Sequence, residues 1–222
     1  MTDIKQVQTE IITVGHKLIH SGLVTGSWGN ISVRVDAATI AVTPSGRDYL
    51  SLQEADISLV DLMGNQHFGS LLPSSELPLH LAVYQARGDV RAIVHTHSVF
   101  ASACAVARRG IAPIIEDLVQ VVGGSVDVAP YALPGTIELA KSVVKTLGKK
   151  NAVLLANHGV LGCGETLSEA LLCCELVEKA AQIFIYGQFL GGAVSLSEAD
   201  CLTMHQFYDE QYRYRQGDKK NV

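Results

Sequence analysis

Two apolar runs that each lead into histidine constrain this chain more than any other feature of its sequence. The run AIVH ends at His95 and continues into Thr96 and His97, and the run AVLLAN leads directly into His158 and Gly159. Short apolar runs of this kind favour buried β-strands. Side chains two residues apart in a strand point to the same side, so His95 and His97 can reach one ion. We therefore predict a sheet in which two strand ends meet and three imidazoles converge.

Three neutral imidazoles with one open position are typical of a catalytic zinc site rather than a structural one. Imidazole also binds other transition metals. We expect one divalent ion per subunit, with Zn²⁺ favoured and Mn²⁺ or Co²⁺ as alternatives. A His-x-His pair by itself is more often an ordinary surface or core pair than a metal site. The third histidine at a strand end argues against that simpler interpretation here.

Three short loops combine glycine, serine and open backbone amides. They are GSWGN at 26–30, PSG at 44–46 and Ser74-Ser75-Glu76 before a predicted helix. Small residues let amides approach an oxyanion closely, and a helix N-terminus favours negative charge. Each loop alone is most simply a turn or a helix cap, and Glu76 could pair with His80 on one helix face. Neither common glycine-rich nucleotide motif occurs in the sequence.

Hydrophobic periodicity and turn residues predict an α/β fold. Helices are expected at 4–19, 75–87, 98–107, 136–147, 166–187 and from 195, and strands at 31–35, 39–43, 57–62, 90–95 and 151–157. Residues 111–115 look strand-like, and residues 119–122 are ambiguous. Thr166 with Glu169, and Ser195 with Glu198, have the spacing of capping boxes. We expect one domain over 1–222, with a central, largely antiparallel sheet, surrounding helices, and a C-terminal helix and frayed tail from about 195.

Composition excludes several classes of protein. The 222 residues are 48% hydrophobic, which suits one α/β domain with a substantial core, and the net charge of −5 leaves no basic footprint for nucleic acid. The five cysteines form no CxxC pair, which argues against a disulfide framework or a cysteine zinc site. The N-terminus is polar and the apolar runs are interrupted, so we expect no leader, no membrane partner and a cytoplasmic protein.

The motifs GSWGNIS, TPSG, LPSSE, HTHS and NHG, in this order, resemble those of the class II aldolase/adducin family. The segment APYALPGT at 129–136 is similar to the fuculose-phosphate aldolase branch of that family. The resemblance runs from the first helix to about the YGQFL helix and implies an α/β/α fold and a homotetramer with active sites at subunit interfaces. It implies His95, His97, His158 and Glu76 as metal ligands, with Glu76 also acting as a base. The implied phosphate site comprises Gly29, Asn30, Ser45, Gly46, Ser74 and Ser75.

The same resemblance implies a metal-dependent lyase. The expected reaction is retro-aldol cleavage of a ketose 1-phosphate, of a deoxy sugar, to dihydroxyacetone phosphate and an aldehyde. A bound cation would polarise the carbonyl and stabilise the enediolate left by cleavage. Two other reactions stay open: 4-epimerisation of L-ribulose 5-phosphate and dehydration of methylthioribulose 1-phosphate. A non-enzymatic scaffold like the adducin head is a further alternative, but it would be expected to have a broken metal site.

One segment departs from the fuculose-phosphate aldolase pattern. Where those enzymes carry a proton-donating tyrosine supplied across the subunit interface, this chain has Glu116-Asp117. Either acid could take over proton transfer on the aldehyde side, or the pair could be a solvated acidic turn. A second family tyrosine comes from the C-terminal tail, for which the candidates are Tyr208, Tyr212 and Tyr214. Each of these three fits equally well on an amphipathic helix.

Overall fold

The computed structural model describes residues 3–214 and is built around one eight-stranded sheet. The strand order is β4-β3-β2-β1-β5-β8-β7-β6, and only the pair β6–β7 is parallel. The bounds are β1 Asn30–Arg34, β2 Thr39–Val42, β3 Ser58–Asp61, β4 Gln66–Phe68, β5 Ala92–Thr96, β6 Val128–Ala129, β7 Ala152–Leu155 and β8 Gly159–Gly164. The predicted, largely antiparallel sheet is therefore confirmed. The tail GDKKNV, predicted to be frayed, lies outside the described residues.

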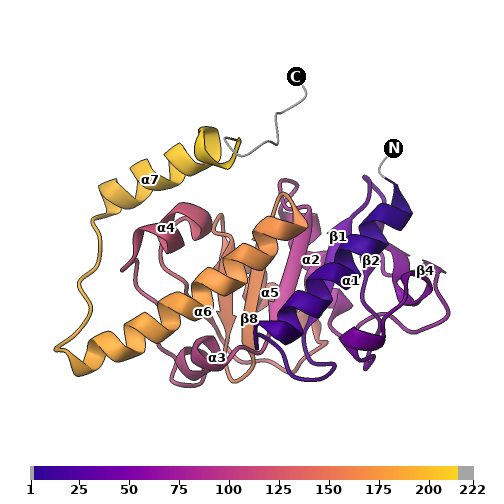
Figure 1. The fold of residues 1–222 in the computed structure, drawn as a ribbon, viewed down its shortest axis with the longest axis horizontal. Coiled ribbons are helices and arrows are strands. Elements are labelled where there is room, and N and C mark those ends of the chain that lie inside the picture. The colour runs from indigo at the N-terminus through magenta and orange to yellow at the C-terminus, as the bar shows by residue number, and fades with distance from the viewer. Residues whose placement is uncertain (1–2, 215–222) are drawn as a thin grey trace.

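Helices cover both faces of this sheet, because its central strands are apolar on both sides. In β5, Ala92 and Val94 pack into the cluster formed with α1 and α6, whereas Ile93 packs into the cluster formed with α2 and α5. Figure 1 shows α1 and α6 crossing one face of the sheet. The helices are α1 Ile4–His20, α2 Leu77–Ala86, α3 Val99–Val106, α4 Glu116–Val122, α5 Ile137–Leu147, α6 Leu167–Phe189 and α7 Glu198–Glu210, with short 3-10 turns at Tyr49–Ser51, Glu54–Asp56 and Tyr212–Tyr214. The expected α/β/α layering is confirmed.

The two predicted capping boxes have different outcomes. At the start of α6, the Thr166 hydroxyl accepts from the Glu169 backbone N–H, and the Glu169 carboxylate accepts from the Thr166 N–H. At the start of α7 the cap is Ser197, whose hydroxyl accepts from the Asp200 backbone N–H. The choice of Ser195 was wrong by two residues, because an acidic residue follows Ser197 at the same spacing.

Besides the short strands β4 and β6, which the sequence did not predict, two longer segments differ from the sequence prediction. The strand expected at 111–115 is wrong, since Ile111 makes only an isolated bridge with Val126 and the chain then enters α4. Acidic residues in the first turn of α4 and Gly123, with φ of 89°, at its end explain this helix over 116–122. Strand β8 was missed because its sequence, GVLGCG, is rich in glycine. A Cβ at Gly162 would lie 2.7 Å from the Cys174 sulfur of α6, so the strand needs glycine to pack there.

The five cysteines of the chain are all buried, and none is paired with another in this structure. Burial raises the pKa of Cys163, Cys173 and Cys174, so these thiols stay protonated and pack as small apolar side chains. Within residues 3–214, no helix combines the length and the apolar character that crossing a membrane requires.

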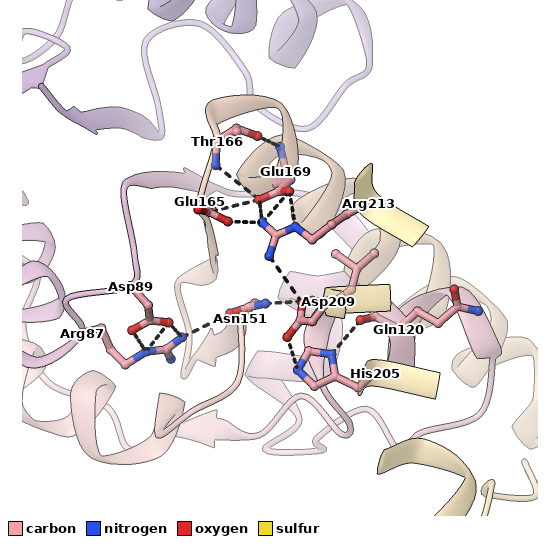
Figure 2. Close-up of polar contacts among 11 residues, drawn as sticks. Arg87, Asp89, Gln120, Asn151, Glu165, Thr166, Glu169, His205, Asp209 and Arg213 are labelled. Atoms are coloured by element: carbon pink, nitrogen blue, oxygen red, sulfur yellow. Dashed lines mark hydrogen bonds and ion pairs between the residues drawn. The ribbon is translucent and has the colours of Figure 1, made fainter. Parts of the chain in front are cut away.

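The C-terminal helix α7 and the 3-10 turn after it are attached to the body by polar and charged side chains (Figure 2), besides the buried Tyr208. Arg213 binds the carboxylates of Glu169 and Glu165 near the start of α6. His205 of α7 lies with its Nδ1 2.7 Å from the carbonyl oxygen of Gln120 in α4. The helix therefore rests across α4 and reaches back to the N-terminus of α6.

Candidate active site and metal centre

Strand β5 and the turn between β7 and β8 bring the three histidines together. His95 lies within β5, and His97 follows its last residue. Asn157 turns the chain with φ of 56°, a left-handed conformation that asparagine tolerates, and His158 comes next. Because β8 pairs with β5, this turn sits beside the end of β5. A Cβ at Gly159 would clash with the carbonyl oxygen of Thr96, so only glycine allows this approach.

The three imidazoles point their Nε2 atoms at a common point. The His95 Nε2 lies 2.9 Å from that of His97 and 3.3 Å from that of His158. The ring centroids are 4.7–4.8 Å apart, with interplanar angles of 68–72°. Two nitrogens bound to one tetrahedral zinc ion would be about 3.3 Å apart, given zinc–nitrogen bonds of ~2.0–2.1 Å. The observed nitrogen spacing therefore fits a shared cation.

Glu76 supplies the fourth candidate ligand from the cap position of α2. Its Oε2 lies 3.2 Å from the His95 Nε2, and its Oε1 lies 3.4 Å from the His158 Nε2. Asn30, which is paired with His95 in the β1–β5 register, donates a hydrogen bond of 2.9 Å to Oε2. The Oε1 is buried without a hydrogen-bond partner, as expected of an oxygen that serves a cation. All four ligand atoms lie within 4.8 Å of one another.

His80, the alternative partner for Glu76, turns toward β1 instead. Its Nδ1 lies 2.6 Å from the hydroxyl of Ser32, which is also 2.8 Å from the hydroxyl of Tyr84. Complete burial, with the charge of His95, lowers the pKa of His80 to about 3. His80 is therefore neutral and belongs to a buried hydrogen-bonded group beneath the site.

The electrostatics of the cluster suit cation binding. Burial, with the charges of His95 and His158, lowers the pKa of His97 to about 3, and burial with the charge of His95 lowers that of His158 to about 4. Burial alone would raise the pKa of Glu76, but the charges of His95 and His158 and the Asn30 hydrogen bond hold it well below its usual range. Burial opposes a charge on His95, but the Glu76 carboxylate and the Val160 carbonyl raise its pKa above the usual range. At neutral pH the site thus offers two unprotonated imidazoles, His97 and His158, and an ionised carboxylate, and a bound cation would displace the proton that Glu76 favours on His95.

The three glycine- and serine-rich loops meet beside the cluster and form one cavity of about 340 Å³. An isolated bridge between Pro44 and Pro73 holds the second and third loops together. Gly29 has φ of 86°, and a Cβ there would lie 2.6 Å from the His95 carbonyl oxygen, so the first loop approaches β5 as only glycine can. All six predicted phosphate-site residues line this cavity: Gly29, Asn30, Ser45, Gly46, Ser74 and Ser75.

The predicted proton-transfer residues lie elsewhere in this chain. Within residues 3–214, Glu116 and Asp117 do not line the cavity; they open α4, where Asp117 pairs with Lys179 of α6. Tyr208 is buried on α7, and Tyr212 and Tyr214 form the 3-10 turn that follows it. Any role for these five residues in the chemistry stays a prediction.

Two lining residues had no role assigned from the sequence. Trp28 lies in the first loop with its ring centroid 5.7 Å from that of His97. Pro134 reaches the cavity from the segment before α5. The position of Trp28 inside a glycine-punctuated loop was the available signal, because a large exposed aromatic residue there has no core to fill.

Comparisons with known proteins agree with this geometry. The family model described as the class II aldolase and adducin N-terminal domain matches residues 9–185. A 5-deoxy-D-ribulose 1-phosphate aldolase of Bacillus thuringiensis serovar kurstaki is 35% identical over 88% of this chain and 92% of its own. The L-fuculose phosphate aldolase of Escherichia coli K12 is 38% identical over 79% of this chain and 81% of its own. A solved L-fuculose 1-phosphate aldolase superposes with a TM-score of 0.89 at 37% identity, covering 92% of this chain and 96% of that one.

Proposed function

Because the chain belongs to the class II aldolase and adducin family, we propose that it is a metal-dependent sugar-phosphate aldolase. The reaction is retro-aldol cleavage of a deoxy-ketose 1-phosphate to dihydroxyacetone phosphate and an aldehyde. One observation carries this proposal: three histidine nitrogens and the Glu76 carboxylate lie within 4.8 Å of one another, beside a cavity lined by loops suited to an anion. The two curated relatives named above are, by their names, a 5-deoxy-D-ribulose 1-phosphate aldolase and an L-fuculose phosphate aldolase, and both names support a sugar phosphate as substrate.

The substrate phosphate would rest among the loops. Ser74 and Ser75 precede α2, whose N-terminal dipole favours the anion, and Gly29 allows the first loop to approach closely. Ser45 and Gly46 would close the other side of the phosphate. Holding the phosphate there orients C2, C3 and C4 of the sugar against the metal centre, and such positioning lowers the barrier.

His95, His97 and His158 would hold the cation, with Glu76 as a further ligand before substrate enters. We favour Zn²⁺ for this set of imidazoles, with Mn²⁺ or Co²⁺ as alternatives. The bound ion supplies a Lewis acid for the ketose carbonyl and for the negative charge left when the C3–C4 bond breaks. Glu76, whose Oε1 lacks a hydrogen-bond partner, would take up a proton from solvent once substrate displaces it from the ion and would deliver that proton to C3, while the C4 hydroxyl returns one proton to solvent through a second group.

The hydroxyl at C4 must lose a proton as the aldehyde forms, and a second group has to accept it. We assign this step to Glu116 or Asp117 of a neighbouring subunit, since within the described subunit neither residue lines the cavity. This assignment requires a homotetramer with active sites at its interfaces, and we include that assembly, and a cytoplasmic location, in the proposal.

A coupled assay for dihydroxyacetone phosphate tests the function directly. Release of this product from 5-deoxyribulose 1-phosphate or fuculose 1-phosphate, lost on chelation and restored by Zn²⁺, is expected. Conversion of a pentulose 5-phosphate to its epimer, or water loss from methylthioribulose 1-phosphate, without dihydroxyacetone phosphate release would contradict it. A scaffold role predicts a protein without bound divalent metal, and the complete set of His95, His97, His158 and Glu76 argues against it.

A further inference from the structure

Trp28 is the only tryptophan of the chain, and it lies against a candidate metal ligand instead of in the core. Its side chain is 66% exposed, although a ring of this size normally gains stability from burial. The planes of the Trp28 and His97 rings are tilted by 34°. Trp28 and His97 border both the anion-lined cavity and a shallower pocket shared with Thr25. An exposed aromatic side chain in this position calls for a role at the site.

The three imidazoles are held in different ways. His95 is completely buried within β5, and its Nδ1 lies 2.9 Å from the Val160 carbonyl oxygen, a contact that fixes the ring. His158 follows the tight turn at Asn157, and its side chain is only 13% exposed. His97 comes after the last residue of β5, so no strand pairing fixes its backbone. Its ring is oriented by packing against the rings of His95 and His158 and against the tilted ring of Trp28.

Backbone contacts at Trp28 and at the next residue restrict the position of the indole ring. Its N–H donates to the carbonyl oxygen of Thr25 within the loop. The next residue, Gly29, lies so close to β5 that a Cβ would contact the His95 carbonyl oxygen. The loop that carries the indole is thus held against β5, the strand that contains His95 and that His97 directly follows.

We propose that Trp28 is a positioning residue that keeps the His97 imidazole in its metal-binding orientation and shields that side of the ion from solvent. The inference rests on the metal centre of the proposed function. Groups that orient a metal-bound histidine are usually hydrogen-bond acceptors, and their loss commonly weakens metal binding ~10–100-fold. Here ring packing takes the place of such an acceptor for His97.

The test compares the metal affinity of Trp28→Ala, Trp28→Phe and wild-type protein, measured by Zn²⁺ competition with a chelator of known affinity. Trp28→Ala should bind Zn²⁺ about 10–100-fold more weakly, and Trp28→Phe should recover most of the loss because it keeps a ring beside His97. Phe189→Ala is the matched control, since that aromatic residue is 83% exposed at the end of α6. Its affinity should equal that of the wild type.

Fluorescence of the single indole gives a second readout that needs no turnover. Co²⁺ added to metal-free wild-type protein should quench Trp28 with a midpoint that matches the binding curve, and His97→Ala should abolish this quenching. Equal Zn²⁺ affinity in Trp28→Ala and wild-type protein would overturn the inference while leaving the proposed function intact. A wild-type protein that binds no divalent metal would overturn both. If metal-free Trp28→Ala and metal-free wild-type protein unfold at the same temperature, a folding defect in the variant is excluded.

Discussion

Glu76 combines two properties that seldom occur together: it is almost completely buried, and one of its oxygens has no hydrogen-bond donor. Asn30 and the charge of His95 keep the group ionised, so the desolvation cost of burial is offset only within this cluster. A carboxylate held in this way can act as a ligand and as a proton carrier. The two roles are separable by substitution.

Replacing Glu76 by glutamine keeps the shape of the side chain but removes its charge and its capacity to accept a proton. We expect turnover to fall by ~10²–10⁴-fold, the usual contribution of a positioned acid or base. Metal content should fall far less, because the three imidazoles remain. Steady-state kinetics and metal analysis of Glu76→Gln measure both quantities. Glu138→Gln, an exposed glutamate in the first turn of α5, is the control, and wild-type turnover in Glu76→Gln would remove this residue from the mechanism.

His158→Ala removes one of the converging nitrogens and should release the metal while the fold survives. The core clusters around α2, α5 and α6 do not include this side chain, so far-ultraviolet circular dichroism should be unchanged. Metal analysis after dialysis should show the loss, together with nearly complete loss of turnover. His67→Ala, which alters an exposed histidine near Asp61, is the matched control. Full metal occupancy in His158→Ala would refute the assignment of this ligand.

The first glycine loop packs closely against strand β5, and adding one methyl group at Gly29 tests whether this contact matters for substrate binding. Gly29→Ala places a Cβ 2.6 Å from the His95 carbonyl oxygen, so either the loop or the strand must move. Gly26→Ala shares a positive φ, 62°, but meets nothing within 4 Å. We expect both variants to lose stability from backbone strain, of about 1 kcal/mol or more. Only Gly29→Ala should also raise KM for the phosphorylated substrate, and equal KM values in the two variants would contradict the loop's role.

Helix α7 offers a test of how a peripheral element is attached. Arg213 binds Glu169 through two nitrogens, at 3.0 and 2.6 Å, and its side chain is mostly buried (Figure 2). Losing these charge-assisted bonds in Arg213→Ala should lower the free energy of opening α7 by about 1.5–3 kcal/mol. Hydrogen exchange of α7 amides measures this change. Arg47→Ala, which breaks the ion pair of the exposed Arg47 with Asp56, should alter α7 exchange little.

Periodicity and capping predicted most helices, because burial of one apolar face leaves a clear pattern in the sequence. The His95, His97 and His158 convergence also followed from strand alternation. The failures have physical causes that lie outside local sequence. Strand β8 needs its glycines because α6 approaches it closely. The segment at 111–115 has β-favouring residues, but it pairs with another segment only at Ile111. The packing of Trp28 on His97 depends on a loop path that no local pattern encodes.

At the scale of the whole molecule, the segments that lead into the candidate active site expose large apolar side chains. Large apolar side chains remain exposed at Leu72, Leu133 and Ile137, close in sequence to the cavity-lining Ser74 and Pro134. Large apolar side chains that stay exposed in one chain are often covered by a partner. Together with the position of Glu116 away from the cavity, this favours an active site completed across an interface.

Mixing two inactive variants tests that assembly. Glu76→Gln removes the carboxylate at the metal, and the double variant Glu116→Gln/Asp117→Asn removes the acids proposed to act from the neighbour. Each should be nearly inactive alone. If every site combines one Glu76 with acids of the next subunit, equal co-expression should leave about one quarter of the sites in a cyclic tetramer with both groups intact, and restore activity accordingly.

The activity restored by mixing shows whether each active site is formed by one chain or by two. Sites confined to one subunit never regain both groups by mixing, so the mixture would be as inactive as its components. A double variant with wild-type turnover would instead show that Glu116 and Asp117 take no part. Because Asp117 also pairs with Lys179, the variant Lys179→Ala serves as a control for the double variant. Normal turnover of Lys179→Ala would show that losing this ion pair does not by itself reduce activity. Recovery near one quarter, with Lys179→Ala active, requires acids that reach the metal centre from a neighbouring chain.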